Sequence, residues 1–74
     1  MKQLELDLSE PLRPGDRVLK FKGTYVAYGT VLSVFKTSLG KELVAFEFKT
    51  HPGMIHIFAP SQLRRVTEGE YFYD

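Results

Sequence analysis

The most chemically informative stretch is HPGMIHIFAP, residues 51–60, in which a turn signal runs directly into an apolar segment that carries one imidazole. An imidazole donates and accepts hydrogen bonds, and its flat ring can stack on a planar ligand. Side chains alternate between two faces in an extended segment, so His56 and Phe58 share one face and Ile57 lies on the other. Two interpretations of His56 stay open: a functional group on a strand, or a histidine in ordinary strand packing.

Several common kinds of site are excluded by residues that the chain lacks. It contains neither a GxGxxG nor a Walker A loop, the two standard phosphate cradles. Cysteine is absent, which excludes thiol chemistry and disulfides, and no Ser-His-Asp set is present. No cluster of histidines and carboxylates has metal-ligand spacing, so no metal is expected. A monomer this small forms a ligand-sized cleft with difficulty. The sequence therefore indicates a binding module, or an enzyme whose site forms between subunits.

Length and charge limit the classes of partner. The chain has 74 residues, which predicts one domain, and ten Lys and Arg oppose nine Asp and Glu, so bulk charge does not demand nucleic acid. Small domains without disulfides often gain stability by forming oligomers. The acidic N-terminus and the lack of a long apolar run predict a cytoplasmic protein with no membrane partner. The middle of the chain is nevertheless basic and would attract an anion, small or polymeric, through Arg17, Lys20, Lys22, Lys36, Lys41, Lys49, Arg64 and Arg65.

The elements that position these residues are predicted to be short strands. Alternation is clearest in ELVAFEFK, where Val44, Phe46 and Phe48 face one way. Turn signals separate this strand from its neighbours. The pattern predicts an all-β fold, a small five-stranded SH3-like barrel with a single helical turn before the last strand. The strands are expected at 17–22, 30–36, 42–49, 54–58 and 63–66, and the helical turn at 59–62.

The ends of the chain are expected to lie outside this barrel, which we place at residues 13–67. Residues 1–12 form an N-terminal arm in which Leu4, Leu6 and Leu8 alternate with polar and charged residues, a weak strand pattern that either pairs at an edge or stays flexible. Residues 68–74 form an acidic and aromatic tail. No segment has the length and period of a regular helix.

Six short motifs, taken in order over residues 15–66 with a short insertion at 23–29, resemble the type II, plasmid-borne, trimethoprim-insensitive dihydrofolate reductases. That family has Gly-Asp-Arg-Val before its first strand, a pore lysine two residues later, and a His-Pro-Gly turn before the motif Val-Gln-Ile-Tyr. The matching residues are Gly15-Asp16-Arg17-Val18, Lys20, Thr37-Ser38-Leu39, His51-Pro52-Gly53, Ile55-His56-Ile57-Phe58 and Leu63-Arg64-Arg65-Val66.

The resemblance implies a function and an assembly. Members of the family are SH3-like barrels that form homotetramers around one central pore. They reduce dihydrofolate with NADPH there, without a dedicated general acid, by holding the two ligands face to face. We therefore expect NADPH as cofactor, dihydrofolate as substrate and a homotetramer that is insensitive to trimethoprim.

The resemblance also implies roles for individual residues. Lys20, His56, Ile57 and Phe58 would form the catalytic and NADPH-binding site, and His51 would lie at the contact between dimers. The chain departs from the family where His56 replaces glutamine and Phe58 replaces tyrosine, and it has no tryptophan to match the family's first loop. Four imidazoles around one axis would repel one another if all were protonated.

Other interpretations of the same residues remain. Lys20 could be a solvated lysine on an outer strand face, Phe58 a packing residue and His51 a solvated turn residue. The family fold could also have acquired a different ligand. The alternative function is a non-catalytic SH3-like or KOW-like barrel that binds nucleic acid or a protein partner. Its contacts would come from the basic middle and from Tyr25, Tyr28, Tyr71, Phe72 and Tyr73.

Overall fold

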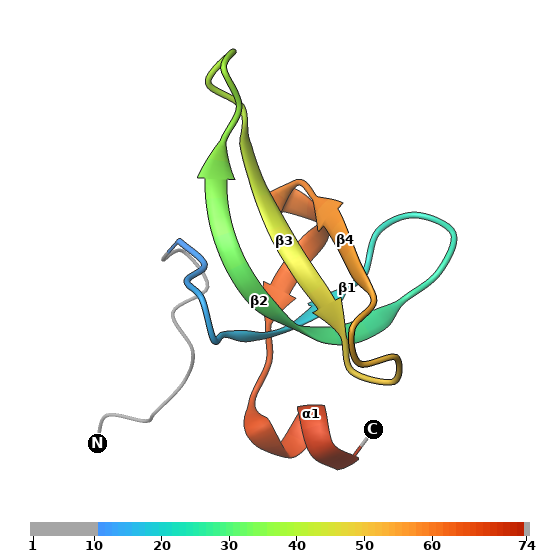
Figure 1. Ribbon diagram of the computed structural model, residues 1–74. Helices are drawn as coiled ribbons and strands as arrows, with labels where there is room; N and C mark the ends of the chain where they lie inside the picture. The colour runs from blue at the N-terminus through green and yellow to red at the C-terminus, as the bar shows by residue number, and fades with distance from the viewer. Residues whose placement is uncertain (1–10, 74) are drawn as a thin grey trace, which may run out of the picture.

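The protein folds as one antiparallel sheet with short helical segments, and the computed structural model describes residues 11–73 (Figure 1). The predicted arm pattern at Leu4, Leu6 and Leu8 lies outside the described residues. No helix within residues 11–73 is long and apolar enough to cross a membrane. The elements are β1 (Arg17–Lys20), β2 (Ala27–Lys36), β3 (Glu42–Phe48), β4 (Ile55–Phe58), the 3-10 turn η1 (Pro60–Gln62), β5 (Leu63–Arg65) and α1 (Glu68–Tyr73).

The five strands are hydrogen-bonded in the order β4-β3-β2-β1-β5. Consecutive strands from β1 to β4 pair as antiparallel neighbours, whereas β5 returns to pair with β1, so that Val18 lies opposite Arg65. This order, with η1 directly before the last strand, is the arrangement expected of an SH3-like fold. The all-β prediction and the predicted helical turn are confirmed.

The core is built from the inward positions of β1, β2 and β3. Val18, Val31, Val44 and Phe46 are almost completely buried. In β3 the buried positions alternate as the sequence predicts, because every second side chain points to the same face. The ring of Phe46 packs edge-on against Phe48 at 5.0 Å and against Phe58 at 5.3 Å, which extends the core from β3 to β4. These contacts fix the position of β4 on the sheet.

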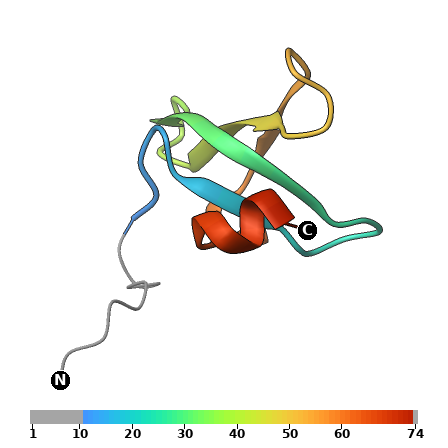
Figure 2. The ribbon, with the colours of Figure 1, turned by 90° about the horizontal axis from the view of Figure 1, so that it is seen from below.

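The C-terminal segment contains a short helix that the sequence pattern did not predict. Figure 2 shows α1 lying across β1. The guanidinium of Arg17 lies 4.8 Å from the ring centroid of Tyr71 and 4.6 Å from that of Phe72. The hydroxyl of Tyr28 donates to Glu70 Oε2 at 2.7 Å. A six-residue helix is unstable alone, so these tertiary contacts hold it in place.

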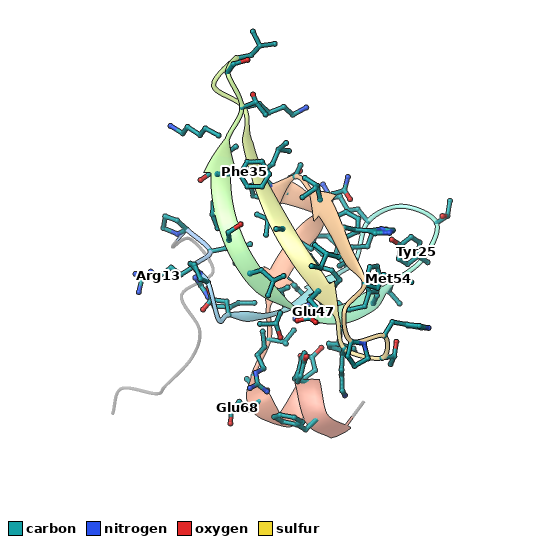
Figure 3. All side chains as sticks on the ribbon, viewed as in Figure 1. Arg13, Tyr25, Phe35, Glu47, Met54 and Glu68 are labelled. Carbon is teal, nitrogen blue, oxygen red and sulfur yellow. The ribbon has the colours of Figure 1, made fainter. Side chains whose placement is uncertain are left out.

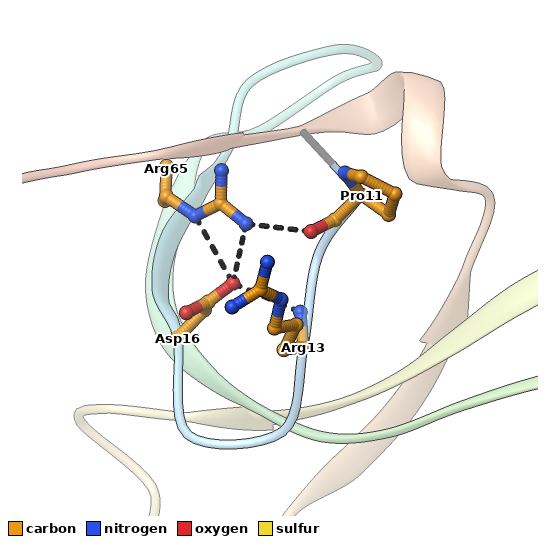
Figure 4. A network of polar contacts seen from close by, with 4 residues as sticks. All are labelled: Pro11, Arg13, Asp16 and Arg65. Carbon is orange, nitrogen blue, oxygen red and sulfur yellow. Dashed lines mark hydrogen bonds and ion pairs between the residues drawn. The ribbon is translucent and has the colours of Figure 1, made fainter. Parts of the chain in front are cut away.

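An ion pair joins the turn before β1 to the last strand (Figure 4). Arg65 donates from Nε and Nη2 to Asp16 Oδ2, at 3.0 and 2.8 Å, and from Nη2 to the carbonyl of Pro11 at 2.7 Å. The backbone N–H of Arg13 donates to the same carboxylate oxygen at 2.9 Å. Two motifs from opposite ends of the sequence, GDRV and LRRV, are therefore in direct contact.

Candidate functional site

Three of the residues expected in a site converge from opposite parts of the sheet. Lys20 ends β1 and Phe58 ends β4, and these strands are separated by β2 and β3. The Lys20 ammonium nevertheless lies 5.7 Å from the ring centroid of Phe58, and the His56 ring lies 6.0 Å from the same ring. The curvature of the sheet therefore gathers a cation, an imidazole and a phenyl ring on one side of the molecule.

Tyr25 adds a further ring to this group. It stacks on Phe48 with a centroid distance of 6.4 Å and an interplanar angle of 23°, and Phe48 packs edge-on against His56 at 5.0 Å. His56 is exposed, whereas Phe48 is buried beneath it. Figure 3 shows Tyr25 on the loop between β1 and β2, on the side of the sheet where β4 lies. In this site, the buried ring of Phe48 therefore lies beneath the exposed rings of Tyr25 and His56.

Lys20 is the one polar or charged side chain that is buried among residues 11–72, with 3% of its surface exposed. Its ammonium donates to the carbonyl of Lys22, and to that of Tyr25 at 3.0 Å, and lies 3.8 Å from the centroid of the Tyr25 ring. Carbonyl dipoles and an aromatic face replace the water that a buried charge loses. Lys20 is therefore not a solvated lysine on an outer strand face, because it points inward beside Val18.

Ile57 and His51 lie away from this group. The Ile57 side chain points to the opposite face of β4 and is half-exposed. His51 lies in the exposed turn before β4, where its Nδ1 is 2.9 Å from Thr50 Oγ1 and its carbonyl accepts the N–H of Met54. In one chain, neither side chain joins Lys20 and Phe58. Their roles in a site or an interface stay predictions.

The opposite face of β2, β3 and β4 exposes apolar side chains to solvent. The strand register places Ile57 beside Ala45 and Phe35 beside Leu43, with Ile55 farther along β4. Phe35, Ile55 and Ile57 are exposed, and Leu43 and Ala45 are partly buried. We call these five residues the outer apolar face. A contiguous exposed apolar surface is typical of an interaction site.

One cavity lies in another part of the described residues. It has a volume of about 170 Å³ and is lined by Pro11, Val34, Pro60 and Arg65 among others, with none of the expected site residues. A space of this size is too small for a dinucleotide. Within residues 11–73, no group of three or more histidines and carboxylates is placed to hold a metal ion. Within residues 11–73, the expected site residues of one chain therefore present rings and charge at a surface and do not line this cavity.

Comparison with protein-family models and with curated proteins gives no match. The family resemblance therefore depends on the order and spacing of the motifs in the sequence. The sequence pattern did not predict Tyr25 as a member of this group, because strand periodicity carries no information about where a loop side chain points. The glycine at position 23, with φ of +99°, marks the turn that brings Tyr25 back over Lys20.

Proposed function

We propose that this chain is the subunit of a type II dihydrofolate reductase-like enzyme. Four subunits would share one pore, in which dihydrofolate is reduced at the expense of NADPH, and the reaction would be insensitive to trimethoprim. The observation that supports this proposal most strongly is the grouping of Lys20, His56 and Phe58. They stand at the positions of the family's site residues, with His56 and Phe58 in place of glutamine and tyrosine. They come together from two strands that are not neighbours.

The residues present fit ligands of this kind. Dihydrofolate and NADPH both carry planar heterocycles and negative charges. The exposed imidazole of His56 offers a ring for stacking, together with hydrogen bonds to a ligand edge. Phe58 offers packing alone, because it lacks the phenol of the family's tyrosine. NADPH supplies the reducing equivalents when bound, and the contribution of the chain is to orient the two ligands against each other.

The outer apolar face supports the assembly that the proposal requires. A domain of this length buries a smaller fraction of its surface on folding than a larger domain does, and small domains often gain stability from association. Phe35, Ile55 and Ile57 would leave solvent if this face packed against a second copy. Symmetric assembly would also multiply the rings and cations, because each subunit contributes an identical set to a shared axis. A site that is shallow in one chain would then be enclosed.

The experiment that tests the proposal is NADPH oxidation with dihydrofolate, with and without trimethoprim. The protein should be tag-free and come from a host that lacks its own chromosomal reductase. We expect turnover that persists under the drug, and a mass of four subunits by light scattering. The variants His56→Gln and Phe58→Tyr, which install the family's residues, should retain or raise the turnover. A stable monomer, or failure to bind both ligands, would refute the proposal.

The loop between β1 and β2 favours one alternative. Phe21 is exposed, and the ammonium of Lys22 lies 5.9 Å from its ring centroid. An exposed ring beside a cation is the pairing that binds single-stranded nucleic acid. Affinity for an oligonucleotide should then fall steeply with salt and be lost in Phe21→Ala. Binding that is absent or independent of salt would remove this alternative.

A further inference from the structure

We infer that Tyr25 is a ligand-stacking residue of the proposed site, and that Lys20 positions Tyr25 in place of contacting the ligand itself. This inference depends on the proposed function, and it changes the role of the lysine that the sequence resemblance supplies. It assigns the stacking surface to a loop residue that has no place in the quoted motifs. The ligand class is a planar heterocycle that carries negative charge.

The first line of evidence is the way in which the Lys20 ammonium uses its donors. Two of its three N–H groups donate to loop carbonyls, those of Lys22 and Tyr25. The side chain is almost completely buried, so a phosphate or carboxylate would have to displace these carbonyls to reach the ammonium. The geometry therefore favours a lysine that organises its own loop.

The second line of evidence is the fit between the loop and the ammonium. A Cβ atom added at Gly23 would lie 2.8 Å from Lys20 Nζ, and the φ of Gly23 is +99°, which side chains rarely adopt. The turn is therefore shaped so that its backbone can close over the charge. Tyr25 follows two residues later and is placed by that turn.

The third line of evidence is the position of the Tyr25 ring. It rests against Phe48 and the Lys20 ammonium, yet 42% of the residue stays exposed. Phe48 also packs against His56, so the two exposed rings of Tyr25 and His56 contact the same buried ring. A ring that is held by its surroundings loses little conformational entropy when a ligand stacks on it. The nearby positive charge also favours an anionic ligand at that place.

The test is a double-mutant cycle read out by binding of NADPH and of dihydrofolate, each measured by calorimetry. We expect Tyr25→Ala to weaken binding about tenfold or more, as for loss of a stacked ring. Tyr25→Phe should bind as the unmodified protein does, because the hydroxyl plays no part. Lys20→Met should weaken binding to a similar degree, and the double variant should be no weaker than the worse single variant. Val26→Ala, in the same loop and 66% exposed, is the matched control and should leave binding unchanged.

A second readout needs no ligand. In the free protein, NMR should show the Tyr25 ring resonances of Lys20→Met moving toward the values of a mobile tyrosine, while the core resonances stay unchanged. If Lys20→Met does not fold, the binding of Tyr25→Ala and Tyr25→Phe tests the role of Tyr25 alone.

Three outcomes would contradict the inference. Multiplicative effects of Lys20→Met and Tyr25→Ala on the dissociation constant would overturn it and show direct contact between the lysine and the ligand. Unchanged binding in Tyr25→Ala would overturn it as well, with the proposed function intact. Absence of binding by the unmodified protein would refute the proposed function and the inference together.

Discussion

Replacing Arg65 by methionine should destabilise the protein far more than the same change at its neighbour Arg64. The Arg65 side chain is 12% exposed and donates hydrogen bonds to the carboxylate of Asp16 and to the carbonyl of Pro11. The Arg64 side chain is 42% exposed and pairs with Glu70 at 3.0 Å. The two positions share residue type, strand and substitution. The difference between them therefore isolates the effect of burial on an ion pair.

The magnitude follows from the donors that are lost. Hydrogen bonds to a charged group contribute roughly 1.5–3 kcal/mol, and the carbonyl of exposed Pro11 can be rehydrated, so we expect Arg65→Met to cost about 2–3 kcal/mol. An exposed pair such as that of Arg64 contributes about 0–1 kcal/mol. A domain of this length has a free energy of unfolding of roughly 4–11 kcal/mol. Loss of the Arg65 contacts would thus remove a large part of the free energy of unfolding.

The assay is urea unfolding followed by circular dichroism, at one fixed protein concentration so that association does not change. The midpoint should fall for Arg65→Met with an unchanged slope, and the melting temperature should drop by roughly 10–20 °C. Adding Asp16→Asn to Arg65→Met should cost little more, because the partner is already gone. Equal destabilisation by Arg64→Met and Arg65→Met, or a cost below about 1 kcal/mol at Arg65, would refute the reasoning.

Two other changes probe the packing and the assembly. Gly29→Ala should destabilise by roughly 1–3 kcal/mol or more in the same urea assay, because its Cβ would lie 2.4 Å from the Phe46 ring. Gly69→Ala is the control, since its Cβ would meet nothing closer than 3.8 Å, and we expect no loss of stability there. Ile57→Glu should lower the mass measured by light scattering while the circular dichroism spectrum is retained. Leu39→Glu, on an exposed hairpin, should leave the mass unchanged, and equal masses for both variants would contradict a subunit contact on the outer apolar face.

The parts of the fold that depend on alternation were predictable. Val44, Phe46 and Phe48 are buried as the pattern of β3 indicates, and η1 lies within residues 59–62, where a helical turn was expected. The observed strand boundaries differ from the predicted ones where tertiary contacts determine the conformation of a loop. The first strand ends at Lys20, earlier than predicted, because its ammonium holds the following residues in a turn. The second strand begins at Ala27, earlier than predicted, because Ala27 pairs with Lys20.

The features that the sequence did not predict are those that depend on distant partners. The helix α1 lacks the length that local propensity requires, and Tyr71 is buried because it packs on Tyr28 and Arg17. The inward direction of Lys20 runs against the usual exposure of lysine, and it is possible because the loop supplies carbonyl acceptors. The grouping of His56 with Phe58 could be predicted from the alternation of side chains along a strand. The position of Tyr25 could not, because it depends on the conformation of the loop.

The pairing of β1 with β5 has a consequence for synthesis of the chain on the ribosome. Asp16 and Val18 are synthesised early, whereas their common partner Arg65 is synthesised much later. Val18 lies opposite Arg65 in the sheet, and the Asp16 carboxylate binds the Arg65 guanidinium. During elongation β1 therefore keeps one edge without its hydrogen-bonding partner, and the Asp16 carboxylate lacks its cation, until residue 65 has emerged. Unpaired strand edges are sites of mispairing, and contacts between distant residues form slowly. Completion of the sheet is thus delayed until residue 65 has been made, and until then the free edge of β1 can pair with a neighbouring nascent copy of the chain.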